Sequence, residues 1–328
     1  MPGQSTIPVC PVIVGPTAGG KSALSIAVAR AFEARGLTAE IVSADSVQIF
    51  RQMDIGSAKP TTGEMAGVPH HLIDVVDPED RFTVHDWLAA AESAVEQIRA
   101  RNAVPIVVGG TNLYIKAFME GLFEGPEPDA GVRAALQSIP QADRRAELER
   151  VDPAAAERIH PNDERRTVRA LEVYRQTGVP ITEHQQQWDR GARADAALFG
   201  IHWQTEALNR RINARVKRMM EQGLLAEVES LRDRLGPQAR EALGYKQLLA
   251  HLAGETPLDD AVEKIKIETR RFAKNQRTWL RRLATTSAAN PRSGWYAGES
   301  ISGDLEQPIK SAESIVDACL KASEAGSE

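Results

Sequence analysis

A glycine-rich segment near the N-terminus contains the first residues whose types and spacing could do chemistry. It reads Gly15-Pro16-Thr17-Ala18-Gly19-Gly20-Lys21-Ser22 and matches the pattern G-x-x-x-x-G-K-[ST] between an apolar run and a stretch of helix formers. Glycines allow backbone N–H groups to surround phosphate oxygens, Lys21 and the helix N-terminus add positive charge, and the Ser22 hydroxyl can bind Mg²⁺. A glycine-rich turn without a ligand is the alternative, but it gives no reason for Lys and Ser to follow directly. The segment therefore predicts a phosphate-binding loop, whether the phosphate belongs to a nucleotide or to another compound.

Polar residues also follow two further apolar runs. Asp45-Ser46-Val47-Gln48 comes after Glu40–Ser43, and Thr111 comes after Val107-Val108-Gly109-Gly110. Open α/β sheets bind ligands at such strand ends, where a carboxylate can act as a general base or a metal ligand. Asp, Ser and Thr also cap helices, so the sequence leaves both roles open for Asp45 and Thr111. A P-loop ATPase usually carries an Asp after an apolar strand, and the Gly-Gly-Thr found here argues against that class.

Basic residues are concentrated in one late segment of the chain. Lys and Arg total 40 against 45 Asp and Glu, and the net charge of −5 by itself argues against a nucleic-acid partner. Residues 264–282, however, hold eight Lys or Arg against Glu268 alone, a local charge of +7. The cations recurring at three- and four-residue spacing are Lys266, Arg270, Lys274, Arg277 and Arg281, and the apolar residues between them are Ile265, Phe272, Trp279 and Leu283. This pattern predicts a helix with one cationic and one apolar face.

A cationic helix face is typical of contact with a phosphate backbone, although a solvated face paired with acidic neighbours has the same pattern. Two further clusters favour an RNA contact surface: Arg165, Arg166 and Arg169, and Arg210, Arg211 and Arg215. His70-His71 does not indicate a metal site, because adjacent residues on a strand point to opposite faces.

The elements that must position these residues alternate between strand-like and helical patterns. The expected strands are Val9–Val14, Glu40–Ser43, His71–Val76, Pro105–Val108 and Phe199–Trp203, and the expected helices between them include Ala23–Arg35 and Val84–Arg101. Such alternation predicts an α/β fold in which a parallel sheet, of the kind found in P-loop NTPases, is flanked by helices on both faces.

The length of 328 residues suggests two domains, or one α/β domain with an insertion. We expect residues 1–122 to form the first part of the core and 123–197 an inserted helical subdomain. Residues 198–287 then return to the core with the helices Glu206–Arg234, Arg240–Leu252 and Leu258–Leu283. From Ala288 onward small and acidic residues dominate, so we expect 288–328 to be a weakly ordered tail.

Composition excludes several classes of protein. Hydrophobic residues at 42% and charged residues at 26% are ordinary for a globular protein. The only cysteines, Cys10 and Cys319, are too far apart in sequence to indicate a disulfide framework or a metal-binding pair. The N-terminus lacks the pattern of a signal peptide, and no apolar run approaches the ~20 residues of a spanning helix. We therefore expect a cytoplasmic protein, a monomer, without membrane association.

Taken together, the motifs resemble the tRNA dimethylallyltransferase family, also called tRNA isopentenyltransferases. The motifs are GPTAGGKS at 15–22, DSVQIF at 45–50, MDIGSAKP at 53–60, HHLID at 70–74, VGGTNLY at 108–114, RALEV at 169–173, LGYK at 243–246 and KNQRTWLR at 274–281. The similarity spans roughly residues 10–283. It departs from the family at Gly19, Phe50 and Asn275, where Ser, Tyr and a basic residue are usual. No Cys/His pattern follows residue 283, which implies a bacterial-type enzyme without the zinc finger of eukaryotic members.

The resemblance implies transfer of a dimethylallyl group from dimethylallyl diphosphate to N6 of the adenosine immediately 3′ of the anticodon in tRNA, with Mg²⁺ and release of diphosphate. The loop is of the ATP-binding kind, and the resemblance implies that it holds the diphosphate of the prenyl donor. Asp45 is then the general base, Lys21, Thr111 and Arg215 stabilise the leaving diphosphate, and Ser22 binds the metal.

The resemblance also implies contacts with the tRNA anticodon stem-loop. The residues concerned are Asp45, Ser46, Val47 and Gln48; Arg165, Arg166 and Arg169; Gly244, Tyr245 and Lys246; and Lys274, Asn275, Gln276, Arg277, Thr278, Trp279, Leu280 and Arg281. Three alternatives share part of this pattern: an adenylate isopentenyltransferase, a P-loop kinase or NTPase, and a non-catalytic RNA-binding module. The first has no use for the insertion or the basic helix, the second lacks its strand-end Asp, and the third does not need the phosphate loop.

Overall fold

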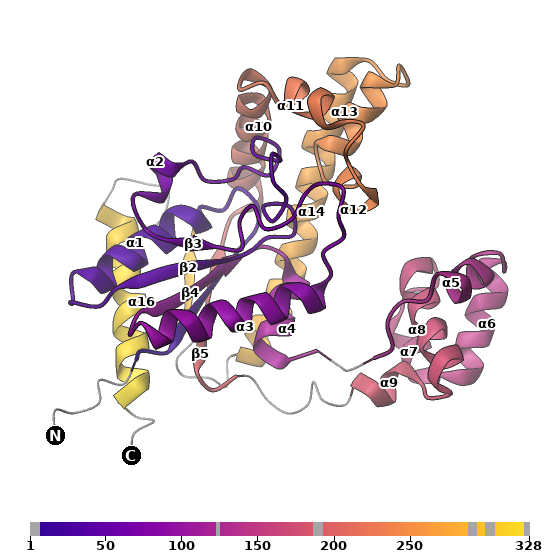
Figure 1. Ribbon diagram of the computed structural model, residues 1–328, viewed down its shortest axis with the longest axis horizontal. Coiled ribbons are helices and arrows are strands. Elements are labelled where there is room, and N and C mark those ends of the chain that lie inside the picture. The colour runs from indigo at the N-terminus through magenta and orange to yellow at the C-terminus, as the bar shows by residue number, and fades with distance from the viewer. Residues whose placement is uncertain (1–6, 123–124, 186–192, 288–293, 299–305, 325–328) are drawn as a thin grey trace. The chain divides into compact units, whose positions relative to one another are not determined.

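A parallel β-sheet forms the core of the larger of two compact units (Figure 1). The computed structural model describes residues 7–122, 125–185, 193–287, 294–298 and 306–324. Within them a six-stranded sheet runs in the order β3-β2-β4-β1-β5-β6. Its strands are β1 (Cys10–Val14), β2 (Ala39–Ala44), β3 (His70–His71), β4 (Val104–Gly109), β5 (Ala196–His202) and β6 (Gly294–Ala297), and all neighbours pair in parallel. The prediction of an α/β fold with a parallel sheet is confirmed.

Helices cover both faces of the sheet. One face packs on α1 (Lys21–Glu33) and α16 (Glu306–Glu324), and the other on α3 (Val84–Ala100) and α4 (Asn112–Glu120). Successive residues of β1 alternate between these cores: Ile13 joins the first, whereas Val12 and Val14 join the second. A strand buried on both sides must be apolar throughout, which explains the unbroken apolar runs in the sequence.

The short strand β3 differs from the expected strand His71–Val76. It contains only His70 and His71, because Leu72 and Asp74 have φ values of 60° and 56°. Left-handed residues cannot continue a strand, so the chain turns away after His71. Residues 72–76 instead form a loop whose backbone bonds to that of residues 48–49.

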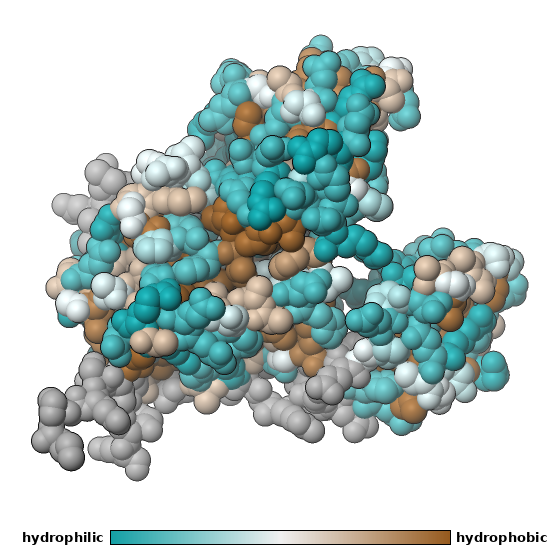
Figure 2. All heavy atoms as spheres, viewed as in Figure 1, coloured by the Kyte–Doolittle hydropathy of each residue, from teal (hydrophilic) through white to brown (hydrophobic). Residues whose placement is uncertain are grey.

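A group of helices follows β5 and includes the segment with the highest concentration of basic residues. Its members are α10 (Thr205–Glu221), α11 (Leu224–Leu231), α12 (Pro237–Arg240), α13 (Tyr245–Leu252) and α14 (Leu258–Ser287). The single helix expected over 206–234 is wrong, because Gly223, with φ of 100°, ends α10 and starts α11. Surface over these helices, at the top of the view, is mostly hydrophilic, and apolar surface gathers over the loops below them (Figure 2). A third core cluster joins the helices to the segment Ile49–Met53.

The C-terminal residues correct the expectation of a weakly ordered tail. β6 pairs with β5, and α16 packs along α1. Ala312, Ile315, Val316 and Cys319 are fully buried at the spacing of one helix face, a pattern that the small and acidic composition obscured. The remaining residues of this region, 288–293, 299–305 and 325–328, lie outside the described part of the chain.

The chain divides into two compact units, one of residues Met1–Met119 with Arg193–Glu328 and one of Glu120–Ala192. The second unit is helical, and its own core cluster includes Leu136, Leu148 and Leu171. Its helices are α5 (Ala130–Gln137), α6 (Gln141–Val151), α7 (Pro153–Arg158), α8 (Glu164–Thr177) and α9 (Ile181–His184). Residues 196–197, expected in the insertion, belong instead to β5, where Ala196 pairs with Cys10. Among described residues, no helix is long and apolar enough to cross a membrane.

Candidate active site at the phosphate loop

The glycine-rich segment forms the turn between β1 and α1. Ala18 and Gly20 adopt left-handed conformations, with φ of 58° and 86°, and the Gly19 N–H donates to the Pro16 carbonyl at 3.1 Å. Gly20 is the N-cap residue of α1, which begins at Lys21. The first N–H groups of a helix have no partner within it, so the loop and the start of α1 offer donors to an anion. The predicted location, between a strand and a helix, is correct.

Gln276 of α14 ties this loop to the end of β4. Its Oε1 accepts from the Thr17 N–H at 2.8 Å, and its Nε2 donates to the Gly110 carbonyl at 2.8 Å. A Cβ on Gly110 would lie only 2.6 Å from Gln276 Nε2 and 3.2 Å from Lys21 Nζ, so glycine is needed at this crossing. Gly110, directly after β4, therefore leaves room for the side chains of Gln276 and Lys21.

Helix α10 and the strand before it hold the other side of the loop. The bonds are Trp203 Nε1 to Gly19 O at 3.1 Å, Arg211 Nε to Ala18 O at 2.9 Å and Arg215 Nη1 to Thr17 Oγ1 at 3.5 Å. The Arg211 guanidinium also lies 4.7 Å from the centre of the Trp203 ring. Sequence analysis missed the part played by Trp203 and Arg211, because neither stands in a motif and both lie nearly two hundred residues from the loop.

Three charged groups converge beside the loop. Lys21 Nζ donates to the Pro16 carbonyl at 2.9 Å. Burial lowers the pKa of Lys21 to about 8, with the carboxylate of Asp45 opposing the change and Arg215 adding to it. Burial likewise lowers the pKa of Arg215, again opposed by Asp45. Two cations thus flank one carboxylate, and an added anion would favour their charged forms.

Asp45 stands directly after β2, and one of its oxygens caps the following turn. Oδ1 accepts from the N–H groups of Val47 at 2.9 Å and Gln48 at 3.3 Å. Thr111 supports the same turn, because its Oγ1 accepts from the Ser46 N–H at 3.0 Å and lies 3.3 Å from Ser46 Oγ. Asp45 therefore caps a turn, and Thr111 supports that turn from the end of β4; their catalytic roles stay predictions. Capping uses Oδ1, and among described residues no hydrogen bond is made to Asp45 Oδ2.

The residues that could hold a metal are few. Among the described residues, no group of three or more His, Cys, Asp or Glu could hold an ion. The Ser22 residue is exposed at the start of α1. Mg²⁺ commonly keeps several waters and takes its remaining ligands from one or two protein oxygens and substrate phosphates. A single hydroxyl beside a phosphate loop fits that mode of binding, and a dedicated protein cage is not needed.

The predicted cationic face of α14 is largely engaged within the protein. Lys266 and Arg270 pair with Glu263, Arg270 also donates to Asn213 of α10 at 2.7 Å, and Arg277 donates to Thr205 at 2.9 Å. Within residues 264–282, the exposed polar residues are Lys264, Arg271, Lys274, Asn275, Thr278, Arg281 and Arg282. Arg270 and Arg277 thus lie on the side of the helix that packs against α10, whereas contact of this stripe with RNA stays a prediction.

Three residues expected to contact tRNA are buried: Tyr245, Gln276 and Leu280. Within the described structure these side chains contact the protein itself, and their contact with tRNA stays a prediction. Gly244, with φ of 94°, starts α13, and Lys246 is exposed in an ion pair with Glu241. Trp279 is partly buried against the core cluster of α3 and α4.

In the second unit, the arginine cluster also separates into exposed and internal members. Arg165 and Arg166 are exposed on α8. Arg169 instead donates to the buried Glu172 carboxylate at 2.7 Å and to the Pro126 carbonyl at 2.9 Å. The role of Arg169 within the described structure is therefore to stabilise this unit.

Phe272 departs from the apolar face predicted for α14. Ile265 and Gln276, seven residues before and four after it, lie on the same side of the helix and are buried, yet Phe272 is 42% exposed. Gln276, one turn along, contacts the phosphate loop, so the Phe272 ring lies near the site.

Comparisons with known proteins identify relatives of this chain. A family model described as IPP transferase matches residues 48–283. A Symbiobacterium thermophilum protein named tRNA dimethylallyltransferase is 46% identical over 303 residues, which cover 88% of this chain and 92% of that protein. A protein of the same name from Desulforudis audaxviator is 45% identical over 278 residues, which cover 83% of this chain and 88% of that protein.

Solved structures show the same relationship. The tRNA isopentenylpyrophosphate transferase of Bacillus halodurans matches with a TM-score of 0.70 and 33% identity over 98% of this chain and 99% of its own. A eukaryotic dimethylallyltransferase acting on tRNA matches with a TM-score of 0.78 and 27% identity over 94% and 79%. The resemblance inferred from the motifs is confirmed, and the chain belongs to the IPP transferase family.

Proposed function

We propose that the protein transfers a dimethylallyl group from dimethylallyl diphosphate to N6 of the adenosine immediately 3′ of the tRNA anticodon, releasing diphosphate. The observation that carries this proposal is the convergence of Lys21, Arg215 and Asp45 at a phosphate loop. Cations and a carboxylate in one site suit a reaction that expels an anion and removes a proton. The relatives' names supply the substrates.

The diphosphate is bound by the phosphate loop. The loop N–H groups, Lys21 and Arg215 stabilise the negative charge that grows on the leaving group as the allylic C–O bond breaks. Because these hydrogen-bond donors and cations are already in position, they stabilise the transition state without reorganising during the reaction. Mg²⁺ bound by Ser22 and the diphosphate would supply further charge neutralisation.

Asp45 acts as the general base. The exocyclic amine of adenosine is a weak nucleophile, because its lone pair is delocalised into the ring. As N6 bonds to the allylic carbon, Asp45 takes one N6 proton, and the C–O bonding pair leaves with diphosphate. General-base catalysis of this type contributes typically 10²–10⁴-fold. Thr111 acts on the position of Asp45 through Ser46.

The exposed side of α14 binds the tRNA backbone around the anticodon loop, with Arg165 and Arg166 as further contacts. The target base must leave its stack to reach the phosphate loop. The exposed Phe272 ring supports such binding, because bases stack on aromatic rings. The buried, unpaired cysteines suit the cytoplasm.

The test uses labelled dimethylallyl diphosphate with purified protein. Four acceptors are offered separately: unmodified tRNA, the same tRNA with the target adenosine replaced by guanosine, AMP and ATP. We expect label only on the unmodified tRNA and only with a divalent cation present. Transfer to AMP or ATP would instead identify an adenylate isopentenyltransferase. Hydrolysis of ATP without transfer would identify an NTPase.

A further inference from the structure

The carboxylate of Glu227 on α11 is held by four hydrogen-bond donors. Oε2 accepts from the N–H groups of Asp54 at 3.0 Å and Ile55 at 2.7 Å, and Oε1 accepts from the Gly56 N–H at 3.0 Å and the Tyr245 hydroxyl at 2.5 Å. Hydrogen bonds to an ionised acceptor are roughly twice as strong as neutral ones. Three consecutive N–H groups on one carboxylate fix the backbone of this turn relative to α11.

Tyr245 completes the arrangement from α13. Its ring is buried against Gly56, where a Cβ would lie 2.4 Å from Tyr245 Cε2. Burial and the adjacent Glu227 carboxylate raise the pKa of the Tyr245 hydroxyl, so it remains a donor to Glu227. The Gly-Tyr-Lys motif, expected to contact tRNA, thus places its Tyr on the turn at 54–56.

A chain of hydrogen bonds leads from this turn to Asp45. The carbonyls of Ser57 and Ala58 accept from Gln48 Nε2 at 3.4 and 3.3 Å, and Gln48 Oε1 accepts from Ser43 Oγ at 3.2 Å. The Gln48 N–H in turn donates to Asp45 Oδ1. The Gln48 side chain is therefore occupied within the protein, and it connects the turn held by Glu227 to the turn that carries Asp45.

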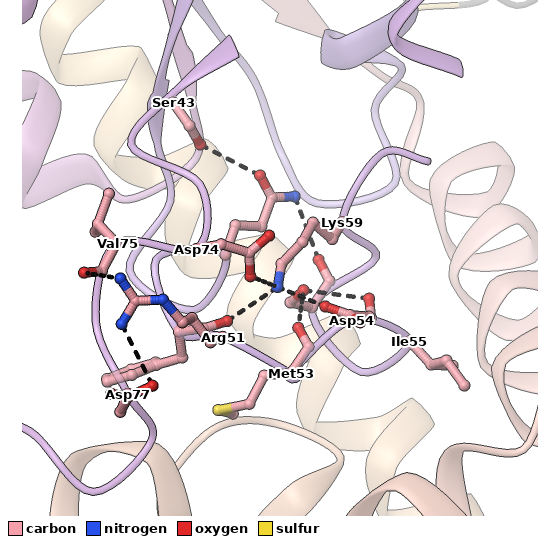
Figure 3. A network of polar contacts seen from close by, with 12 residues as sticks. Ser43, Arg51, Met53, Asp54, Ile55, Lys59, Asp74, Val75 and Asp77 are labelled. Carbon is pink, nitrogen blue, oxygen red and sulfur yellow. Dashed lines mark hydrogen bonds and ion pairs between the residues drawn. The ribbon is translucent and has the colours of Figure 1, made fainter. Parts of the chain in front are cut away.

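Lys59 holds the outer side of the same loop. Its ammonium donates to Asp54 and Asp74, each at 2.5 Å, and to the Phe50 carbonyl at 2.9 Å (Figure 3). These contacts are made by side chains of the loop itself. Glu227 and Tyr245, by contrast, belong to the helices that follow β5, so they connect this loop to a separate part of the first unit.

We propose that Glu227, assisted by Tyr245, is a positioning residue for transfer, which holds the turn at 54–56 and through Gln48 the geometry of Asp45. The inference rests on the proposed function for its kinetic part. Glu227 acts through other residues: its hydrogen bonds within the described chain go to the 54–56 turn and Tyr245. A displacement of about 1 Å at a catalytic group can lower the rate about 10²-fold.

Glu227→Gln is the informative change. The amide keeps one accepting oxygen, but its NH₂ group faces N–H or O–H donors where Glu227 has its second oxygen. Glu229→Gln is the matched control, the same substitution on an exposed residue of the same helix. We expect Glu227→Gln to lower kcat on the order of 10²-fold. The KM for dimethylallyl diphosphate should stay within a few-fold, and Glu229→Gln should match the wild type.

Hydrogen exchange of the full-length protein provides a readout independent of activity. We expect faster exchange across residues 45–58 in Glu227→Gln, with the phosphate loop at 15–20 unchanged. Unaltered exchange overturns the inference, as does faster exchange with a wild-type kcat. A wild type that transfers nothing refutes the proposed function instead, and exchange still decides whether Glu227 holds the turn. If Glu227→Gln does not fold, kcat and hydrogen exchange are measured on Tyr245→Phe, which removes one of the four donors. We expect a lower kcat and faster exchange across residues 45–58 in that variant too.

Discussion

Replacement of Gln276 by Met would separate two roles for this residue. Its sequence context implied contact with tRNA, whereas its amide joins Thr17 to Gly110 inside the protein. Met has a similar length and no hydrogen-bonding amide. The variant therefore leaves the Thr17 N–H and the Gly110 carbonyl without their partner while changing the volume little.

The expected cost follows from the burial of each group. The bond to Gly110 O is buried, and an orphaned buried acceptor costs about 1–3 kcal/mol. The bond to the Thr17 N–H is only partly buried, so water replaces part of it and the loss is about 0.5–1.5 kcal/mol. We expect Gln276→Met to lower the free energy of unfolding by about 1.5–4.5 kcal/mol. Loss of one bond that orders the phosphate loop, about 1 kcal/mol, should also weaken diphosphate binding about fivefold.

Chemical denaturation measures the first quantity and calorimetric titration with inorganic diphosphate the second. The exposed neighbour Asn275 provides the control, since Asn275→Ala should change the free energy of unfolding by less than about 0.5 kcal/mol. Wild-type stability and diphosphate affinity in Gln276→Met, together with weakened tRNA binding, would refute the internal role and restore a direct contact with tRNA.

Three sets of substitutions and one labelling experiment test the site and its surroundings. Asp45→Asn should lower the rate of transfer about 10²–10⁴-fold. Binding of tRNA should stay within severalfold of wild type, because the amide oxygen still caps the turn. Single-turnover rates measure the loss, and full activity would exclude Asp45 as the base. Phe272→Ala should weaken tRNA binding and Phe272→Trp should retain it, whereas equal affinities in a filter-binding assay would exclude stacking. The third change replaces three exposed cations of α14 with Gln: Lys264, Arg271 and Lys274. It should lower the slope of log affinity against log salt by about two units, and an unchanged slope would mean a solvated face. Finally, burial raises the pKa of Cys10 to about 12 and that of Cys319 in the same direction, so below pH 9 neither forms the reactive thiolate in the folded protein. A chromogenic disulfide reagent should therefore react at pH 8 only after unfolding, and fast reaction of the native protein would contradict this burial.

Patterns in the sequence were sufficient to predict those parts of the structure that depend on residues close together in the chain. The phosphate loop, its strand and its helix are contiguous, and the position of Asp45 after β2 follows from an apolar run that ends in a polar residue. Parallel strands buried on both faces are unbroken apolar runs, so the sheet was also predictable. The C-terminal helix α16 could not be read as easily, because its many small and acidic residues obscure the helical spacing of its apolar residues.

The sequence by itself therefore determined the class of fold, the phosphate loop and the family. Only the tertiary structure decided which side of α14 faces solvent, because that depends on α10 packing against Arg270 and Arg277. It also decided that Gln276 reaches Thr17, a residue 259 positions away. Glu227 in particular has no distinguishing pattern, and its role arises from three N–H groups of a distant turn. Periodicity records which residues share a face of an element, but the partner of that face is set by how the whole chain packs.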